Sequence, residues 1–221
     1  MKKLAVLALA AATITAATAG ISVNLDFLFK PDPRNDAQVY LHVANTAYQP
    51  PIEQVRTVYP QMKTPETDFP VLLFLANEAH VSLSVAWDLR AKGLPWVQVM
   101  TRLNVPPERI FVPLQEREPG PPYGKAYGYW RKHPKEHVRI SDDDIFYWVN
   151  VRTNAKYFSV SPETVVSWRE SGPTWKAVAG NQYRGKHGNE GNGKGKGEGN
   201  DNQGDDRGGH GGGKGKGKGK G

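Results

Sequence analysis

A stretch of nineteen residues occurs twice in this chain, at positions 81–99 and 160–178. The two copies align without a gap at an offset of 79, and six of the nineteen positions are identical. The identical pairs are Val81/Val160, Ser82/Ser161, Arg90/Arg169, Gly93/Gly172, Trp96/Trp175 and Val99/Val178. Unrelated segments of this length would share about one residue, so the pair predicts a duplicated structural unit. A repeat indicates architecture and carries no information about a reaction.

Each copy has the signals of two short helices joined by a glycine turn. Ser82 and Ser161 are candidate N-caps, because a serine oxygen can accept a hydrogen bond from the first-turn amides. Apolar residues then recur at helical spacing as far as Gly93 and Gly172, where a left-handed backbone would end the helix. The tryptophan that follows each glycine would pack a second helix against the first.

A longer helix is expected before each copy. Thr64 precedes a run with apolar residues at helical spacing. In the second copy, Ser141 and Asp144 form a candidate capping box. We therefore predict a mainly α fold with two similar three-helix units, at residues 64–105 and 141–180.

The segment before the first unit predicts a small β-hairpin. Apolar residues alternate with polar ones from Ile21 to Phe29 and again from Val39 to Val43, which is the period of a half-buried strand. A turn-rich stretch, KPDPRND, lies between the two runs. The alternation therefore favours two antiparallel strands joined by this turn.

The two ends of the chain differ from its middle. Residues 1–19 contain two lysines, an uncharged alanine-rich run and an A-x-A site ending at Ala19, which is typical of a secretory signal peptide. Residues 181–221 contain 17 glycines and end in GGGKGKGKGKG. A segment with so few apolar side chains is expected to be a disordered, basic tail. The chain contains no cysteine, which excludes disulfides.

These observations predict six segments along the chain. They are a signal peptide (1–19), a β-hairpin segment (20–48), a first helical unit (49–114), a Pro/Gly/aromatic loop (115–140), a second helical unit (141–180) and a disordered Gly/Lys-rich tail (181–221).

The loop at 115–140 mixes aromatic and basic side chains. The candidate binding residues there are Tyr123, Tyr127, Tyr129, Trp130, Arg131 and Lys132. Such a mixture can bind sugars, peptides or single-stranded nucleic acid by stacking. Alternatively, the rings fold back and cover the helical core.

His133, Glu136 and His137 form an H-x-x-E-H string that resembles the inverzincin zinc-protease signature. That chemistry needs both histidines on one helical face, with the glutamate activating a water molecule. Pro134 lies inside the string, and no third ligand is evident downstream. The alternative is a solvated basic loop without a metal, and no cofactor is expected.

Two eleven-residue strings, at 76–86 and 155–165, resemble the helix-turn-helix signature of bacterial repressors. The positions that match are Ala76, Val81 and Ser82 in the first string, and Ala155, Val160, Ser161, Thr164 and Val165 in the second. His80 and Ser159 replace the usual glycine. The resemblance implies a tight helical corner. DNA binding would further require exposed basic or amide side chains on a recognition helix.

The sequence contains no other motif for a reaction, so we expect a non-enzymatic scaffold of a bacterial envelope or matrix, periplasmic or secreted. Its tail would bind anionic polysaccharide or nucleic acid by charge. The tail residues expected to bind are Lys214, Lys216, Lys218 and Lys220. Two alternatives remain: an exported hydrolase with a site at 123–137, and a helix-turn-helix nucleic-acid binder if the protein is not exported.

Overall fold

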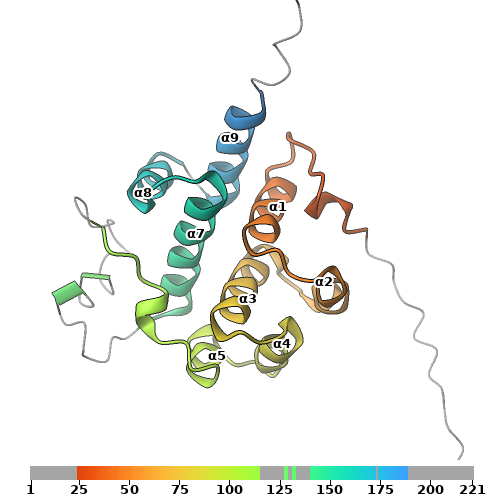
Figure 1. Ribbon diagram of the computed structural model, residues 1–221, viewed down its shortest axis with the longest axis vertical. Helices are drawn as coiled ribbons and strands as arrows, with labels where there is room; N and C mark the ends of the chain where they lie inside the picture. Colours follow the sequence, from red (N-terminus) through yellow and green to blue (C-terminus); the bar gives the residue numbers. More distant parts are fainter. Residues whose placement is uncertain (1–23, 115–126, 129–130, 133–139, 173, 189–221) are drawn as a thin grey trace, which may run out of the picture.

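The computed structural model describes residues 24–114, 127–128, 131–132, 140–172 and 174–188. This part of the chain is mainly helical, as the sequence predicts (Figure 1). Its α-helices are α1 (Asp36–Tyr48), α2 (Ile52–Val58), α3 (Pro65–Ala79), α4 (Leu83–Ala91), α5 (Trp96–Arg102), α7 (Asp142–Phe158), α8 (Pro162–Ser171) and α9 (Trp175–Gly188). Its 3-10 helices are η1 (Asp26–Leu28), η2 (Tyr59–Gln61) and η3 (Pro107–Arg109). No helix in these ranges is long and apolar enough to cross a membrane.

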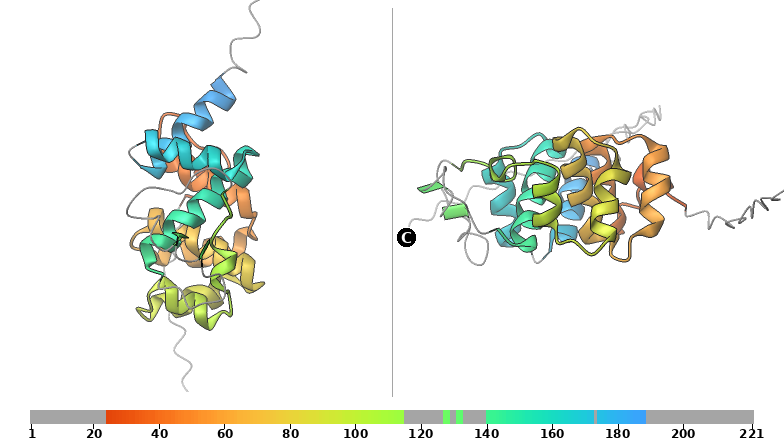
Figure 2. Two further views of the ribbon diagram at one scale, coloured as in Figure 1. Left: turned by 90° about the vertical axis from the view of Figure 1, so that its left-hand side faces the viewer. Right: turned by 90° about the horizontal axis from the view of Figure 1, so that it is seen from below.

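Helices α3 and α7 lie side by side through the middle of the molecule, with α4 and α5 towards one end and α8 and α9 towards the other (Figures 1 and 2). Helix α1 packs against both long helices and against α9. Most of the largest fully buried side chains come from these central helices and from the segment after η3, and they include Tyr40, Phe69, Phe74, Phe111 and Trp148. Helices α1, α3 and α7 therefore share one hydrophobic core.

The predicted β-hairpin is wrong in the described residues. Val39 and Val43, which the alternation places in a strand, lie in α1, and the described residues before α1 contain η1 and no strand. Asn35 caps α1, because its side chain accepts hydrogen bonds from the first-turn amides. Helix α1 is buried on several sides, so its apolar residues do not follow the one-sided spacing of a surface helix.

The two corners that resemble a helix-turn-helix have matching backbones. His80 follows α3 and Ser159 follows α7, and both adopt left-handed conformations, with φ of 55° and 56°. The next amide in each corner bonds back to the helix, from Val81 to the Ala76 carbonyl at 3.0 Å and from Val160 to the Ala155 carbonyl at 3.1 Å. This pattern satisfies carbonyls at the helix end and turns the chain sharply.

The serine caps predicted for the next helices are present. The Ser82 hydroxyl accepts from the Val85 amide at 3.4 Å, and the Ser161 hydroxyl accepts from the Thr164 amide at 3.3 Å. The capping box predicted at the start of α7 also forms, from Ser141 to Asp144.

The glycines that follow the short helices differ from each other. Gly93 has a φ of 84°, the left-handed backbone that was expected. Gly172 is extended, with a φ of −112°, so the prediction of a left-handed end is wrong there. A side chain at Gly172 would come within 2.8 Å of the Val178 side chain, so close packing accounts for this glycine.

Helices α5 and α9 each begin against the first turn of a long helix. The Val97 amide of α5 donates to the Asp142 carboxylate of α7 at 3.1 Å. The Lys176 ammonium of α9 donates to the Glu66 carboxylate of α3 at 2.7 Å. These contacts connect residues before and after the 115–140 segment.

Helix α9 extends beyond the expected start of the tail. The sequence predicts disorder from residue 181, whereas α9 continues to Gly188. The ring of Tyr183 packs edge-on against His42 with centroids 5.6 Å apart, and the Arg184 guanidinium bonds to the Asp36 carboxylate at 2.6 Å. These contacts with α1 order residues that have little helix propensity. Residues 189–221 and the predicted signal peptide lie outside the described residues.

Candidate functional site

Tyr127, one of the predicted binding residues, is buried rather than displayed. Its side chain is fully covered, and its hydroxyl accepts a hydrogen bond from the Leu114 amide at 2.6 Å. Its ring stacks on Trp148 with centroids 4.7 Å apart and lies edge-on to Phe111. Tyr127 therefore packs onto the helical core, as the second alternative for these rings predicts.

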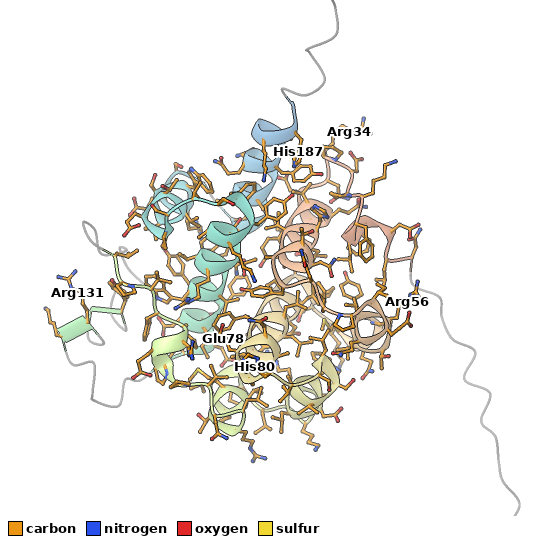
Figure 3. The ribbon with its side chains drawn as sticks, in the orientation of Figure 1. Arg34, Arg56, Glu78, His80, Arg131 and His187 are labelled. Atoms are coloured by element: carbon orange, nitrogen blue, oxygen red, sulfur yellow. The ribbon has the colours of Figure 1, made fainter. Side chains whose placement is uncertain are left out.

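The other predicted site residues fall into two groups. Arg131 and Lys132 are exposed, and Figure 3 shows Arg131 at the edge of the molecule. The remaining candidates lie outside the described residues: Tyr123, Tyr129, Trp130, His133, Glu136, His137, Lys214, Lys216, Lys218 and Lys220. The described ranges contain no group of three or more His, Asp or Glu side chains that could hold a metal ion.

Two exposed lysines meet aromatic rings at an open pocket of about 490 Å³. The pocket is lined by the end of α1 and by side chains of α7 and α9: Thr46, Ala47, Tyr48, Gln49, Lys156, Tyr157 and Lys186. The Lys156 ammonium lies 4.9 Å from the centre of the Tyr48 ring. The Lys186 ammonium lies 5.0 Å from the centre of the Tyr157 ring. We call these four side chains the lysine–tyrosine pocket.

The lysine–tyrosine pocket carries positive charge that no nearby carboxylate neutralises. Within the described part of the chain, neither Lys156 nor Lys186 forms a salt bridge. Arg184 on the same helix is different, because Asp36 pairs with it. The tyrosine rings hold the ammonium groups in place by cation–π attraction, which adds about 0.5–1 kcal/mol at an exposed position. The pocket is therefore suited to an anionic ligand.

Behind the pocket, Tyr157 bonds to a buried histidine. The His42 Nδ1 lies 2.9 Å from the Leu28 carbonyl oxygen, which can only accept, so Nδ1 carries the proton. Its Nε2 then accepts from the Tyr157 hydroxyl at 3.3 Å. Burial lowers the pKa of His42 and raises the pKa of Tyr157 to about 12. Both groups are neutral near pH 7, so the pair supports the pocket wall and offers no charged nucleophile.

The helices that follow the two corners present few basic groups for DNA. Arg90 on α4 bonds to the carboxylates of Asp68 and Asp142. Arg169 on α8 lies over the Trp175 ring, with 5.7 Å between the guanidinium carbon and the ring centre. Lys92 is exposed beyond the end of α4. Base readout would need several exposed donors on one such helix.

Comparison with known proteins finds no match to a family model, to a curated protein or to a solved structure.

The lysine–tyrosine pocket could not be predicted from the sequence. Its four side chains come from positions 48, 156, 157 and 186, and no spacing or motif links them. Only packing of α1 against α7 and α9 brings them together.

Proposed function

We propose that this protein is an exported, non-enzymatic scaffold of a bacterial envelope or matrix that binds anionic polymers. The export signal is the charged, apolar and A-x-A pattern of residues 1–19. The helical part provides a stable body, and the basic C-terminal segment extends its reach towards a polymer.

One observation carries the binding proposal. Lys186, a member of the lysine–tyrosine pocket, lies in the last turn of α9, directly before the Gly/Lys-rich segment (Figure 3 labels the adjacent His187). A polymer held by the pocket would therefore be close to the lysines that follow. The pocket would contribute a fixed site, and the Gly/Lys-rich segment would add non-specific charge.

We further propose that the body consists of two similar three-helix units. The matched corners at His80 and Ser159 support this proposal, as do the matched serine caps. The aligned arginines also match, because Arg90 lies over the Trp96 ring and Arg169 over the Trp175 ring. Duplication of a helical unit suits a scaffold, because it enlarges the core without requiring a new fold.

The binding proposal is tested by chromatography on heparin, with the mature chain applied at low and moderate salt. The double variant Lys156→Gln, Lys186→Gln should elute at lower salt than the unaltered chain, and deletion of 189–221 should lower retention further. Both changes should also reduce the dependence of binding on salt, because fewer counterions are released.

The matched control is Lys63→Gln, Lys92→Gln, which removes the same charge from exposed positions outside the pocket. Equal elution of the two double variants would mean that net charge alone is responsible and would refute the pocket as the binding site. Stronger retention on duplex DNA than on heparin would instead favour the nucleic-acid alternative.

A further inference from the structure

Arg90 in the first copy of the repeated sequence is neutralised by two carboxylates. Its Nε and Nη2 donate to one oxygen of Asp68 at 3.2 and 3.1 Å, and its Nη1 donates to Asp142 at 3.3 Å. The guanidinium also lies over the Trp96 ring at 4.7 Å. The second oxygen of Asp142 accepts from the Val97 amide at 3.1 Å. One carboxylate thus bridges the guanidinium and the start of the helix that follows.

Arg169, which aligns with Arg90, has the same aromatic contact and lacks the carboxylates. It lies over Trp175, and its Nη1 donates to the Gly172 carbonyl at 2.7 Å. Its Nε is buried and has no hydrogen-bond partner, and the guanidinium forms no salt bridge within the described ranges. Tyr147 stands at the position that aligns with Asp68. An N–H donor of a charged group is therefore left without an acceptor, which is costly in a buried position.

A cavity of about 230 Å³ lies beside Arg169. Its apolar walls are Tyr40, Phe146 and Trp175, and its polar rim includes Thr174 and the Lys176–Glu66 salt bridge. Tyr40 is only 2% exposed, and its hydroxyl, which lies against the Asn150 amide, makes no hydrogen bond of good geometry. The cavity is thus lined by two residues that each carry a buried, unsatisfied donor, Arg169 and Tyr40.

We propose that this cavity binds a small organic carboxylate. The ligand's carboxylate accepts from the Arg169 guanidinium and from the Lys176 amide of α9, as Asp142 bridges Arg90 and Val97 in the first copy. Its apolar part lies between the rings of Phe146 and Trp175.

The charges around the cavity favour this class of ligand. Arg169 and the start of α9 favour a negative group, because the first turn of a helix carries a partial positive charge. Glu66, the carboxylate on the rim, is already paired with Lys176. Cavities for drug-sized ligands are about 300–1,000 Å³, so a smaller carboxylic acid fits here.

The binding test uses the mature chain and backbone amide NMR shifts, with acetate, butyrate and benzoate as probes and butyramide and benzamide as neutral controls. At least one of the larger acids should cause saturable shifts at Lys176 and Ala177, and its amide should cause none. The proposal is overturned if no acid saturates these signals, or if acid and amide act equally.

The variant Arg169→Gln should weaken binding of that acid by about tenfold or more, since it removes the charged donor group that the carboxylate bonds to. Arg102→Gln, at an exposed arginine on α5, should leave binding unchanged. Thermal melts show whether each variant is folded. If Arg169→Gln does not fold, the comparison of acid with amide on the unaltered chain still decides. Heparin retention is independent of this cavity, so either proposal can fail alone.

Discussion

At the scale of single residues, His42 links the segment before α1 to helices α7 and α9. It bonds to the Leu28 carbonyl and to Tyr157, and its ring lies edge-on to Tyr183. Burial lowers its pKa in the folded protein, the hydrogen bond to Leu28 opposes this shift, and His187 adds to it. The folded state therefore binds fewer protons than the unfolded state, in which histidine titrates near about 6.5.

This difference predicts acid sensitivity. The contribution of neutral His42 to the free energy of unfolding is complete above about pH 6.5 and is lost as the pH falls towards the lower pKa of the folded state. His42→Asn keeps a donor for the Leu28 carbonyl and removes the titration. Its melting temperature should therefore fall less between pH 7.5 and pH 5 than that of the unaltered chain.

His80→Asn is the control, because His80 is exposed and asparagine tolerates its left-handed backbone. This variant should show the same acid-induced decrease as the unaltered chain. If His42→Asn also shows it, the acid sensitivity arises elsewhere.

The sequence predicted single-residue roles correctly where a side chain bonds to backbone groups that are close to it in the sequence. Ser82, Ser161 and Ser141 cap helices as predicted, because an N-cap depends on amides two or three positions away. Gly172 shows the limit of such reasoning. Its glycine is required by Val178, which belongs to another helix, so its backbone conformation could not be predicted from the local pattern.

At the scale of helices, the two wrong predictions, the β-hairpin and the start of the tail at residue 181, have one cause. Tertiary contacts stabilise both segments: α1 packs against α3, α7 and α9, and the second half of α9 packs against α1. The alternation at 39–43 fits a strand and also fits a helix buried on several sides. The glycines and polar residues of 181–188 fit a tail, and their contacts with Asp36 and His42 override that preference.

Two truncations test this interpretation. Deletion of 189–221 should leave the melting temperature nearly unchanged. Deletion of 181–221 should lower it by several degrees, since it removes the Tyr183 ring contact and the Arg184–Asp36 salt bridge. For a body of this size, about 1–2 kcal/mol of lost stability corresponds to such a shift. Equal melting temperatures for the two truncated chains would show that the end of α9 contributes nothing to the fold.

At the scale of the whole molecule, the proposed export of the protein can be tested most directly. We expect cleavage after Ala19, so that the mature chain begins at Gly20 outside the cytoplasm. Mass spectrometry of the protein from cell fractions checks this expectation. A chain that retains Met1 and stays in the cytoplasm would contradict this expectation. It would favour the alternative of a helix-turn-helix nucleic-acid binder. Ala19→Lys, which should block cleavage, provides a marker for the uncleaved form.

The helical class of the molecule could be predicted from its sequence, and its candidate sites could not. The class follows from caps and spacing within short windows. The lysine–tyrosine pocket and the cavity at Arg169 each combine side chains from distant segments, such as Tyr48 with Lys186 and Tyr40 with Trp175. Such combinations depend on tertiary packing, and no periodicity along one segment encodes them.

The packing of α9 on α1 also has a mechanical consequence. Gly180 brings α9 so close to α1 that any side chain there would overlap the Asp36 carboxylate. If the C-terminal segment is anchored to a polymer, tension enters the body through α9 and reaches α1 first. The contacts of Gly180, Tyr183 and Arg184 therefore bear the load before the shared core of α3 and α7 does, and their strength sets the force that the anchored protein withstands.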